Sequence, residues 1–359
     1  MRVVILGLSI TSSWGNGHAT TFRGLVRELA ARGHDVLFLE RDVPWYAAHR
    51  DLPNPPYGRT GLYGSVDELR RIFGEEIEAA DLVIVGSFVP EGAEIGEWVL
   101  QTTSGIAAFY DLDTPVTLAA MAQGERRYLT PELIPRYRLY LSFTGGPTLQ
   151  RLEAGYGSPM ARPLYCSVDP TIYRPIERAL QWDLGYMGTY SSDRQAILEG
   201  LLLEPARRWS TGRFIVAGPQ YPATAQWPAN VARAEHVSPG EHRAFYGAQR
   251  FTLNLTRVEM VEAGYSPSTR LFEAAACGVP IISDWWAGLD EVFEPGLEIL
   301  IARSSEEVLT ILLEMSEAER ERIGARSRTR VLKNHTAAHR ARELEGYALA
   351  LLAREPATS

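Results

Sequence analysis

The segment 266–280, SPSTRLFEAAACGVP, places Arg270 and Glu273 on the first turns of a predicted helix. Ser266 suits the N-cap and Pro267 suits the first helical position, where a missing N–H is harmless. The free N–H groups and the positive dipole end of a helix bind phosphate, and Arg270 adds a planar cationic donor. Glu273 can accept hydrogen bonds from ribose or sugar hydroxyls. The segment therefore indicates a site for a nucleotide diphosphate, although an ordinary surface ion pair explains the same two residues.

Any phosphate site in this chain depends on arginine. Lys333 is the only lysine among 36 basic residues, so a P-loop or a pyridoxal phosphate enzyme is excluded unless Lys333 serves. The motif LGYMGTYSSDRQ offers a second cation, Arg194, shortly after a turn at Gly188 and Thr189. We expect Arg194 and Arg270 to stabilise the charge of a leaving diphosphate. A solvated helix side chain is the alternative for Arg194.

A histidine follows the first predicted strand, in the loop SITSSWGNGHATT. His18 opens the next helix and is a candidate general base, because imidazole titrates near neutral pH. Alternatively, it only positions the loop, in which Trp14 and Gly17 also lie. A dinucleotide-binding turn, with Glu40 as the acid that binds ribose, is a weaker interpretation. Gly15 and Gly17 come too late after the strand for that fingerprint.

Two aspartates in the motif FYDLDTP end another predicted strand. An Asp-x-Asp pair can bind a metal and a diphosphate, but about one such pair is expected by chance in a chain of this size. The carboxyl end of a parallel strand is where open sheets bind ligands, so we expect Asp111 and Asp113 to face a site. Asp113 is a second candidate base, with a turn or N-cap role as its alternative.

Two segments of the second half carry candidate contacts to the base and the sugar. His236 and Val237 follow a short predicted strand, where backbone groups can bind the edge of a nucleobase, although core packing explains them equally well. Asp284 ends a strand, and Trp285 and Trp286 offer flat apolar surfaces of the kind that pack against sugars. Tryptophan pairs are more often structural.

These residues are positioned by an alternation of short apolar strands and amphipathic helices, which predicts parallel sheets with right-handed crossovers. The predicted strands are VVILGL, DVLFLE, DLVIVG, IAAFYD, LYLSF, PLYC, LGYMG, RFIVAG, FTLNL, VPIISD and LEILIA. The main predicted helices are TTFRGLVRELAARGH, DRQAILEGLLLEPARRW, SPSTRLFEAAACG, SEEVLTILLEM and TAAHRARELEGYALALLAR. The fold class is therefore α/β, with two Rossmann-like domains facing a cleft. The predicted parts are 1–170, 171–334 and a C-terminal helix with its tail at 335–359, which can return to the first domain.

Composition limits the class of partner. A net charge of −8 argues against binding of nucleic acid, which needs a basic face. Cys166 and Cys277 lie far apart in apolar sequence, so neither a disulfide framework nor a cysteine metal site is indicated. No segment approaches the length of an apolar membrane span, and MRVVILGL is too short for a signal peptide. We therefore expect a cytoplasmic protein without an integral membrane segment.

The sequence resembles the GT-B glycosyltransferases, particularly the CgeB-like, spore-coat-type group, over nearly its whole length. Four pieces carry the resemblance: GNGHATTFRGLVRELAARGHDVLFLERD, FYDLDTP, SVDPTIYRP and RLFEAAACGVPIISDWWAGLDEVFEPGLEILIA. The resemblance implies transfer of a sugar from a nucleotide-diphosphate donor, held mainly by the second domain, to an acceptor hydroxyl, held mainly by the first. It also implies that no metal and no resident cofactor take part. The second Glu of the E-x7-E pattern of related enzymes matches Glu273, whereas the first position of that pattern is occupied by Tyr265 in this sequence.

The resemblance and the residues together give the following set of predicted roles. The catalytic residues are His18, Asp113 and Arg270; the donor-binding residues are Gly17, Gly188, Thr189, Arg194, His236, Val237, Ser266, Ser268, Thr269, Arg270 and Glu273; and the acceptor or sugar contacts are Trp14, Asp111, Asp284 and Trp285. UDP, GDP and dTDP sugars are all candidate donors, and a small molecule, a lipid or a polysaccharide is the candidate acceptor. A nucleotide-sugar epimerase, a dehydrogenase and a non-catalytic sugar-binding or coat-assembly protein are the alternatives. The sequence leaves the stereochemistry and the oligomeric state open.

Overall fold

The computed structural model of the protein describes residues 1–353 and divides the chain into two compact units. The first unit contains Met1–Cys166 and the chain from Ala337 onward, and the second contains Ser167–Thr336. The first unit is therefore built from two separate stretches of sequence. The described part of the predicted C-terminal helix, α15 (Ala337–Leu352), packs within this first unit. Residues 354–359 of the predicted tail lie outside the described residues.

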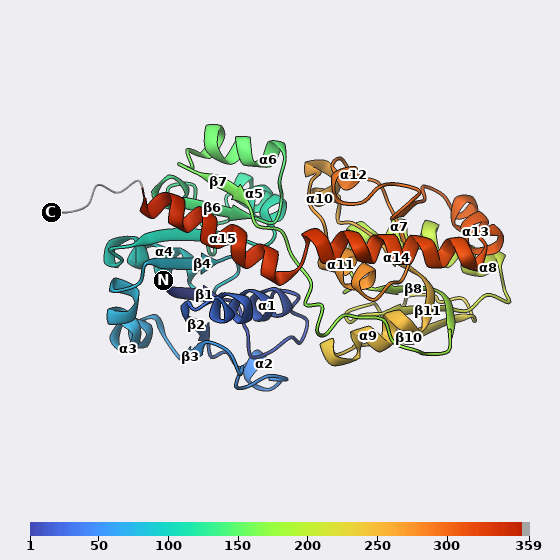
Figure 1. The fold of residues 1–359 in the computed structure, drawn as a ribbon, viewed down its shortest axis with the longest axis horizontal. Helices are drawn as coiled ribbons and strands as arrows, with labels where there is room; N and C mark the ends of the chain where they lie inside the picture. Colours follow the sequence, from blue (N-terminus) through green and yellow to red (C-terminus); the bar gives the residue numbers. More distant parts are fainter. Residues whose placement is uncertain (354–359) are drawn as a thin grey trace. The chain divides into compact units, whose positions relative to one another are not determined.

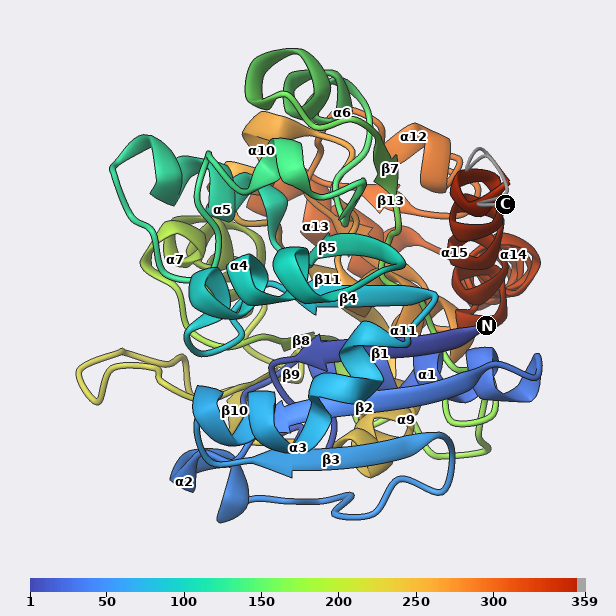
Figure 2. The ribbon, with the colours of Figure 1, turned by 90° about the vertical axis from the view of Figure 1, so that its left-hand side faces the viewer.

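Within the described chain, the first unit holds a sheet of seven strands, all parallel, in the order β3-β2-β1-β4-β5-β6-β7 (Figure 2). The strands are β1 (Arg2–Gly7), β2 (Asp35–Arg41), β3 (Arg59–Tyr63), β4 (Leu82–Gly86), β5 (Ile106–Asp111), β6 (Leu139–Ser142) and β7 (Ala161–Pro163). Five of the six predicted strands lie within a residue or two of these bounds. The strand predicted at PLYC instead ends at Pro163, and β3 is an edge strand that the sequence did not predict because RTGLY lacks an apolar run.

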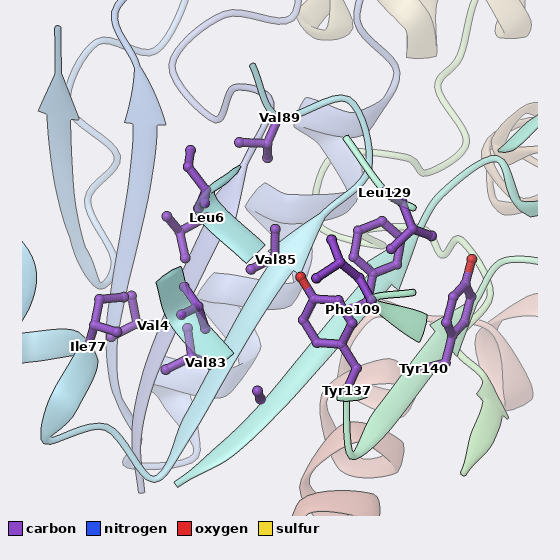
Figure 3. Packing of buried hydrophobic residues seen from close by; sticks show 14 of the residues in the cluster. Val4, Leu6, Ile77, Val83, Val85, Val89, Phe109, Leu129, Tyr137 and Tyr140 are labelled. Atoms are coloured by element: carbon purple, nitrogen blue, oxygen red, sulfur yellow. The ribbon is translucent and has the colours of Figure 1, made fainter. Parts of the chain in front are cut away.

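Along each strand of this sheet, successive side chains point to opposite faces, and both faces are packed with apolar residues. Val4, Leu6, Val83 and Val85 pack on one face, as Figure 3 shows, together with Phe109 and the buried rings of neighbouring strands. The intervening residues of β1 and β4 pack on the other face. Because these strands are buried on both faces, each is a continuous run of apolar residues. Such runs were sufficient to predict the strands from the sequence.

Helices cover both faces of the first sheet. They are α1 (His18–Ala31), α2 (Pro44–Ala47), α3 (Val66–Glu78), α4 (Gly92–Thr102), α5 (Thr114–Ala122), α6 (Pro147–Gln150) and α15 (Ala337–Leu352). α15 lies against α1 (Figure 1), and Ala341, Leu344 and Ala348 join the cluster that contains Phe22 and Leu25. A Cβ at Gly24 would lie 2.9 Å from the Cβ of Ala337, so this glycine lets the two helices approach closely.

The second unit, as far as the chain is described, holds six parallel strands in the order β10-β9-β8-β11-β12-β13. The strands are β8 (Trp182–Met187), β9 (Phe214–Ala217), β10 (Val231–Ala234), β11 (Gln249–Asn254), β12 (Ile281–Ser283) and β13 (Leu300–Ile301). The helices are α7 (Ser192–Leu198), α8 (Glu204–Arg208), α9 (Pro239–Gly247), α10 (Val258–Ala263), α11 (Thr269–Ala276), α12 (Leu289–Val292), α13 (Ser305–Glu314) and α14 (Glu317–Asn334). The predicted fold class, two Rossmann-like parallel α/β domains, is confirmed.

The helix predicted at 193–209 contains a π-helical turn, Glu199–Leu203, between α7 and α8. Pro205 explains the interruption, because it lacks the N–H that an α-helix would direct to the preceding turn. The wider turn accommodates the proline without ending the helix.

The start of α11 differs from the prediction by two residues. The N-cap is Ser268, with extended backbone at φ −78° and ψ 151°, and not Ser266. Ser266 is buried, and its hydroxyl donates to the sulfur of Met260 at 2.8 Å, so this side chain does not cap the helix. The predicted stop is confirmed, because Gly278 has φ +73° just after the C-cap and its N–H donates to the carbonyl of Ala275.

The strand order of each sheet reverses direction at one point, between β1 and β4 in the first unit and between β8 and β11 in the second. Open parallel sheets bind ligands at the carboxyl ends of the strands that flank such a point. The loops after these four strands are therefore where functional side chains are expected. No helix within residues 1–353 is long and apolar enough to cross a bilayer.

Candidate functional site

Arg270 spans the point of strand reversal in the second unit. Its Nε donates to the carbonyl of Met187, at the end of β8, at 2.5 Å, and its Nη1 donates to Oδ1 of Asn254, at the end of β11, at 2.9 Å. The guanidinium carbon also lies 5.0 Å from the ring centre of Tyr186. These contacts fix a cation at the edge of the sheet where a ligand is expected. Across the described residues, Arg270 makes no ion pair with Glu273, so the surface-pair alternative is wrong.

The backbone beside Arg270 approaches it too closely for any side chain. A Cβ at Gly188 would lie 2.4 Å from the hydroxyl oxygen of Tyr186 and 3.0 Å from Nη2 of Arg270. Gly218, at φ +141°, is equally crowded, because a Cβ there would lie 2.0 Å from the carbonyl oxygen of Gly188. Two glycines therefore bring the ends of β8 and β9 together beside the guanidinium.

The second predicted cation lies at the same loop. Nη2 of Arg194 donates to the carbonyl of Thr189 at 2.7 Å, while its buried Nε has no hydrogen-bond partner in the part of the chain that the structure describes. Burial lowers the pKa of Arg194, and the positive charges of Arg270 and Arg257 lower it further. The structure thus brings Arg194 and Arg270 together around Gly188 and Thr189. An anion here would satisfy a buried donor and relieve the repulsion between like charges.

The N-terminus of α11 is tied to the same strand end. The Ser268 hydroxyl donates to Oδ1 of Asn254 at 2.8 Å, the atom that also accepts from Arg270. Nδ2 of Asn254 in turn donates to the Ser283 hydroxyl at 3.0 Å. Asn254 therefore orients both Ser268 and Arg270, and Thr269 follows as the first residue of the helix.

Glu273 is buried one turn further along α11. The Tyr246 hydroxyl donates to Oε2 of Glu273 at 3.2 Å, and Nδ1 of His242 lies 3.6 Å from the same oxygen. His242 also connects this carboxylate to the predicted base-binding segment, because its Nε2 lies 3.1 Å from the carbonyl oxygen of Val237. Glu273 and Val237 thus belong to one hydrogen-bonded cluster, and His236 precedes Val237 in the chain.

The predicted sugar contacts after β12 separate into two kinds. Asp284 is buried and accepts hydrogen bonds from the N–H and the hydroxyl of Thr256, both at 2.9 Å. Burial raises the pKa of Asp284, against the lowering effect of these hydrogen bonds. Its carboxylate therefore fixes the loop after β11. Trp285 is 39% exposed and its neighbour Trp286 is buried, so only the first tryptophan presents a surface for a ligand.

In the first unit, the two candidate bases lie side by side. Nε2 of His18 is 3.7 Å from Oδ2 of Asp113, and both side chains keep a partly exposed surface. Asp113 occupies the N-cap of α5, but within residues 1–353 its side chain makes no capping hydrogen bond. The His18 ring also contacts Phe88, after β4, with ring centres 5.4 Å apart. His18 begins α1 after the loop that follows β1, and Phe88 and Asp113 follow β4 and β5, so the three residues gather near the point of strand reversal.

Asp111 has a different environment from Asp113. It is fully buried and accepts hydrogen bonds from the hydroxyls of Tyr140, at 2.6 Å, and Thr117, at 2.8 Å. Burial raises the pKa of Asp111 to about 6, even though these hydrogen bonds lower it. The two aspartates of FYDLDTP therefore contact different residues. Asp113 lies beside His18, whereas Asp111 is hydrogen-bonded in the interior at the end of β5.

The loop between β1 and α1 is fixed by Glu40, which is buried at the end of β2. Its carboxylate accepts hydrogen bonds from the N–H groups of Ile10, at 2.7 Å, and Thr11, at 3.0 Å, and from the Thr11 hydroxyl. The Glu40 carboxylate is therefore hydrogen-bonded to the protein itself, whereas the dinucleotide-binding alternative required it to bind ribose. Trp14 stacks on His49 with ring centres 4.8 Å apart. Space around Gly17 is open, because a Cβ there would meet no atom within 4 Å.

Several residues of these clusters were missed in the sequence. Asn254 contacts Arg270, His242 contacts Glu273, and Phe88 borders His18 in a left-handed backbone conformation at φ 63°. One signal was available for Asn254: a polar residue at the carboxyl end of an apolar strand, FTLNL, must find a partner there. For His242 the sequence offered only a histidine in a polar helix.

A region of 153 residues, 194–346, matches the protein-family model described as Glycosyl transferase-like. This region contains Arg194, Arg270 and Glu273 together with most of the second unit. No curated protein sequence matches the chain.

Several solved structures share the fold over nearly the whole chain. Anabaena HepE, determined in complex with UDP and glucose, has a TM-score of 0.73 at 11% identity, and the match covers 99% of this chain and 100% of that one. An alpha-glucosyltransferase in complex with UDP and a 13-mer DNA has a TM-score of 0.73 at 12% identity, with 97% and 99% covered. Sucrose-phosphate synthase from Thermosynechococcus elongatus has a TM-score of 0.69 at 14% identity, with 99% and 100% covered. The chain therefore has the GT-B fold.

Proposed function

We propose that this protein is a glycosyltransferase that moves a hexosyl group from a nucleotide-diphosphate sugar to an acceptor hydroxyl. The observation that carries the proposal is the position of Arg270, fixed between the ends of β8 and β11 beside the N-terminus of α11. A guanidinium and free backbone N–H groups together form a site for an anion. The match of residues 194–346 to a glycosyl transferase-like family supports the same assignment.

In the proposed reaction, the bond between the anomeric carbon and the diphosphate breaks while the acceptor oxygen bonds to that carbon. The diphosphate leaves with the bonding electron pair, and Arg270 and Arg194 stabilise its charge. Because these cations are already held by Met187, Asn254 and Thr189, little reorganisation is needed when the charge develops. The proposal assigns this role to arginine and not to a metal ion, and it includes no resident cofactor.

The acceptor proton is assigned to His18. Its Nε2 would take the proton from the attacking hydroxyl, and Asp113, 3.7 Å away, would stabilise the resulting imidazolium. This assignment belongs to an inverting reaction, so the configuration of the product tests it. The acceptor is proposed to bind the first unit near Trp14, and the donor to bind the second.

We propose a UDP-sugar as the donor and a small molecule, a lipid or a polysaccharide as the acceptor. The solved HepE and alpha-glucosyltransferase structures hold UDP, so a UDP-sugar is the first donor to test. A small molecule, a lipid or a polysaccharide is the proposed acceptor class, and the net charge of −8 disfavours nucleic acid. The four sequence motifs favour the CgeB-like group. Cys166 and Cys277 are both buried and form no disulfide within residues 1–353, which supports the proposed cytoplasmic location.

Incubation of the pure protein with UDP-, GDP- and dTDP-sugars, with and without acceptors, tests the proposal. Release of nucleoside diphosphate that accelerates with an acceptor supports transfer, whereas an epimer of the donor would indicate an epimerase instead. Thermal unfolding with UDP, GDP and dTDP identifies the base, because a ligand that prefers the folded state raises its stability. If no nucleotide shifts the unfolding midpoint and no sugar is transferred, the proposal is wrong.

A further inference from the structure

His242 lies at the centre of a buried cluster in the second unit. Its Nε2 is 3.1 Å from the carbonyl oxygen of Val237, and its Nδ1 is 3.0 Å from the hydroxyl of Tyr173 and 3.6 Å from Oε2 of Glu273. The side chain is 14% exposed. Both ring nitrogens therefore face oxygen atoms of the protein, with little water between them.

The chemistry of these neighbours decides which nitrogens carry a proton. A carbonyl oxygen only accepts hydrogen bonds, so Nε2 must donate to Val237. In a neutral ring Nδ1 would then present a lone pair, which suits a donating Tyr173 hydroxyl but faces the negative carboxylate of Glu273. In the charged ring Nδ1 carries a proton and attracts that carboxylate. The geometry is thus fully favourable only when His242 is protonated.

Other titratable groups around the ring modify this balance. Burial lowers the pKa of His242, but the hydrogen bond to Glu273 and the charge of that residue outweigh burial and raise the pKa. Glu241, on the same helix, adds a smaller effect in the same direction and is itself close to His236. Tyr173 and Tyr246 stay neutral, because burial raises the pKa of each well above its usual range. Glu273 is therefore the principal counter-charge.

We propose that protonated His242 is a positioning residue of the donor site, which joins the 236–237 segment to Glu273 so that nucleotide-sugar binding weakens when the proton is lost. The inference rests on the proposed function and on the roles predicted from the sequence, in which Val237 and His236 contact the base and Glu273 contacts the ribose. Loss of the proton removes one of the two contacts that hold Glu273 towards α9 and leaves the hydrogen bond from Tyr246. The link from Val237 through His242 to Glu273 is then weakened.

The direction of the pH effect follows from the same linkage. A group that binds its proton more tightly in the ordered site than in the disordered one favours the ordered site at low pH. The contribution of His242 is therefore present below its ordinary titration range and is lost as pH rises through the raised pKa. This direction is opposite to that expected if the nucleotide needed a neutral imidazole.

Binding of UDP-glucose at several pH values tests the inference, because this ligand carries no group that titrates between about pH 6 and about pH 8.5. We expect the wild-type affinity to fall about tenfold over this range, which corresponds to about one unit of change in pKa on binding. His242→Gln keeps a donor for the Val237 carbonyl but cannot gain a charge. It should bind with the weaker affinity at every pH.

Two further measurements keep the result interpretable. His34→Gln is the matched control, because His34 forms a comparable pair with Glu345, at 3.1 Å, in the other unit. It should keep the wild-type pH profile. A side-chain NMR titration of the wild type reports the protonation of His242 directly, even if the glutamine variant does not fold, and we expect a pKa above the ordinary histidine value.

The outcomes separate the inference from the proposed function. If UDP-glucose binds equally well across the pH range, or if His242 titrates below an ordinary histidine, the inference is overturned while the nucleotide site stands. If none of the UDP-, GDP- and dTDP-sugars binds at any pH, the proposed function fails and the inference fails with it. A pH dependence that disappears in His242→Gln and persists in His34→Gln supports both.

Discussion

Nε2 of His18 lies 3.7 Å from the carboxylate of Asp113, although 94 residues separate the two in sequence. The strand order explains the meeting, because β1 and β5 flank β4 and their carboxyl ends share one edge of the sheet. The side chain of Asp113 does not cap the helix that it begins, so its carboxylate is left facing the imidazole. The pair therefore has the composition of a general base with a carboxylate that stabilises its charged form.

Replacement of His18 should impair the chemical step. We expect His18→Ala to lower kcat by about 10²- to 10⁴-fold with little change in the affinity for the donor, because proton transfer contributes on this scale. Asp113→Asn should lower kcat by a smaller factor, since the imidazole remains. Steady-state kinetics with saturating donor measures both effects. Unchanged kcat in His18→Ala would show that this histidine only positions its loop.

Arg270 should contribute to turnover more than to acceptor binding. Arg270→Ala is expected to lower kcat by about 10²- to 10³-fold, comparable to the loss of one preorganised donor at a charged transition state. Arg270→Lys should recover little, because an ammonium group cannot contact Met187 and Asn254 with the same planar geometry. Arg207→Ala is the control, since Arg207 is a surface arginine of the same unit paired with Glu199 and Glu204. Equal activity of the Arg207 and Arg270 variants would contradict the assignment.

The close approach at Gly188 predicts a steric effect. In Gly188→Ala the new methyl group would meet the hydroxyl of Tyr186 at 2.4 Å and press on Arg270. We expect a loss of about 1–3 kcal/mol in the free energy of unfolding, as in other overpacked sites, and weaker nucleotide binding. Gly200→Ala is the matched control, because a Cβ there meets no atom within 4 Å and alanine favours helix. Denaturant unfolding of both variants measures the difference.

The buried carboxyl of Asp111 predicts a pH-dependent stability. Its pKa in the folded protein is about 6, above the ordinary value of 3.8, so its contribution is full below about pH 4 and is lost as pH rises towards 6. Relative to Asp111→Asn, the wild type should lose on the order of 3 kcal/mol of unfolding free energy over this interval. Parallel denaturant titrations from pH 4 to about pH 7 measure the difference between the two proteins. A constant difference would mean that Asp111 keeps its ordinary pKa.

The fold was largely predictable because its strands are buried on both faces and therefore appear as apolar runs. The edge strand β3 was not predictable, since two of its five residues are exposed and its sequence contains glycine and arginine. The start of α11 was also wrong, although Ser266 and Pro267 have suitable residue types. The Ser266 hydroxyl instead donates to the sulfur of Met260. This contact depends on the position of α10, which the residue types around Ser266 do not indicate.

The candidate site was predictable in its cations and less so in its acids. Arg194 and Arg270 converge as expected, because both follow strands that end at the same edge. Asp111 and Asp284 end strands too, yet each turns inward to hydroxyl groups supplied by other segments. A single sequence does not reveal such partners: Tyr140 lies 29 residues from Asp111 along the chain. The sequence pattern predicted that these acids lie at strand ends. It did not predict in which direction their side chains point.

The pairing of α15 with α1 has a consequence for synthesis of the chain on the ribosome. Phe22, Leu25 and Leu29 belong to a cluster that is completed only by Leu344, Ala348 and Leu351, more than 300 residues later. Residues 167–336 form the second unit and emerge before that partner. The first unit is therefore the last to reach its finished state, and a chain truncated at 336 would expose the apolar side of α1 and be prone to aggregation.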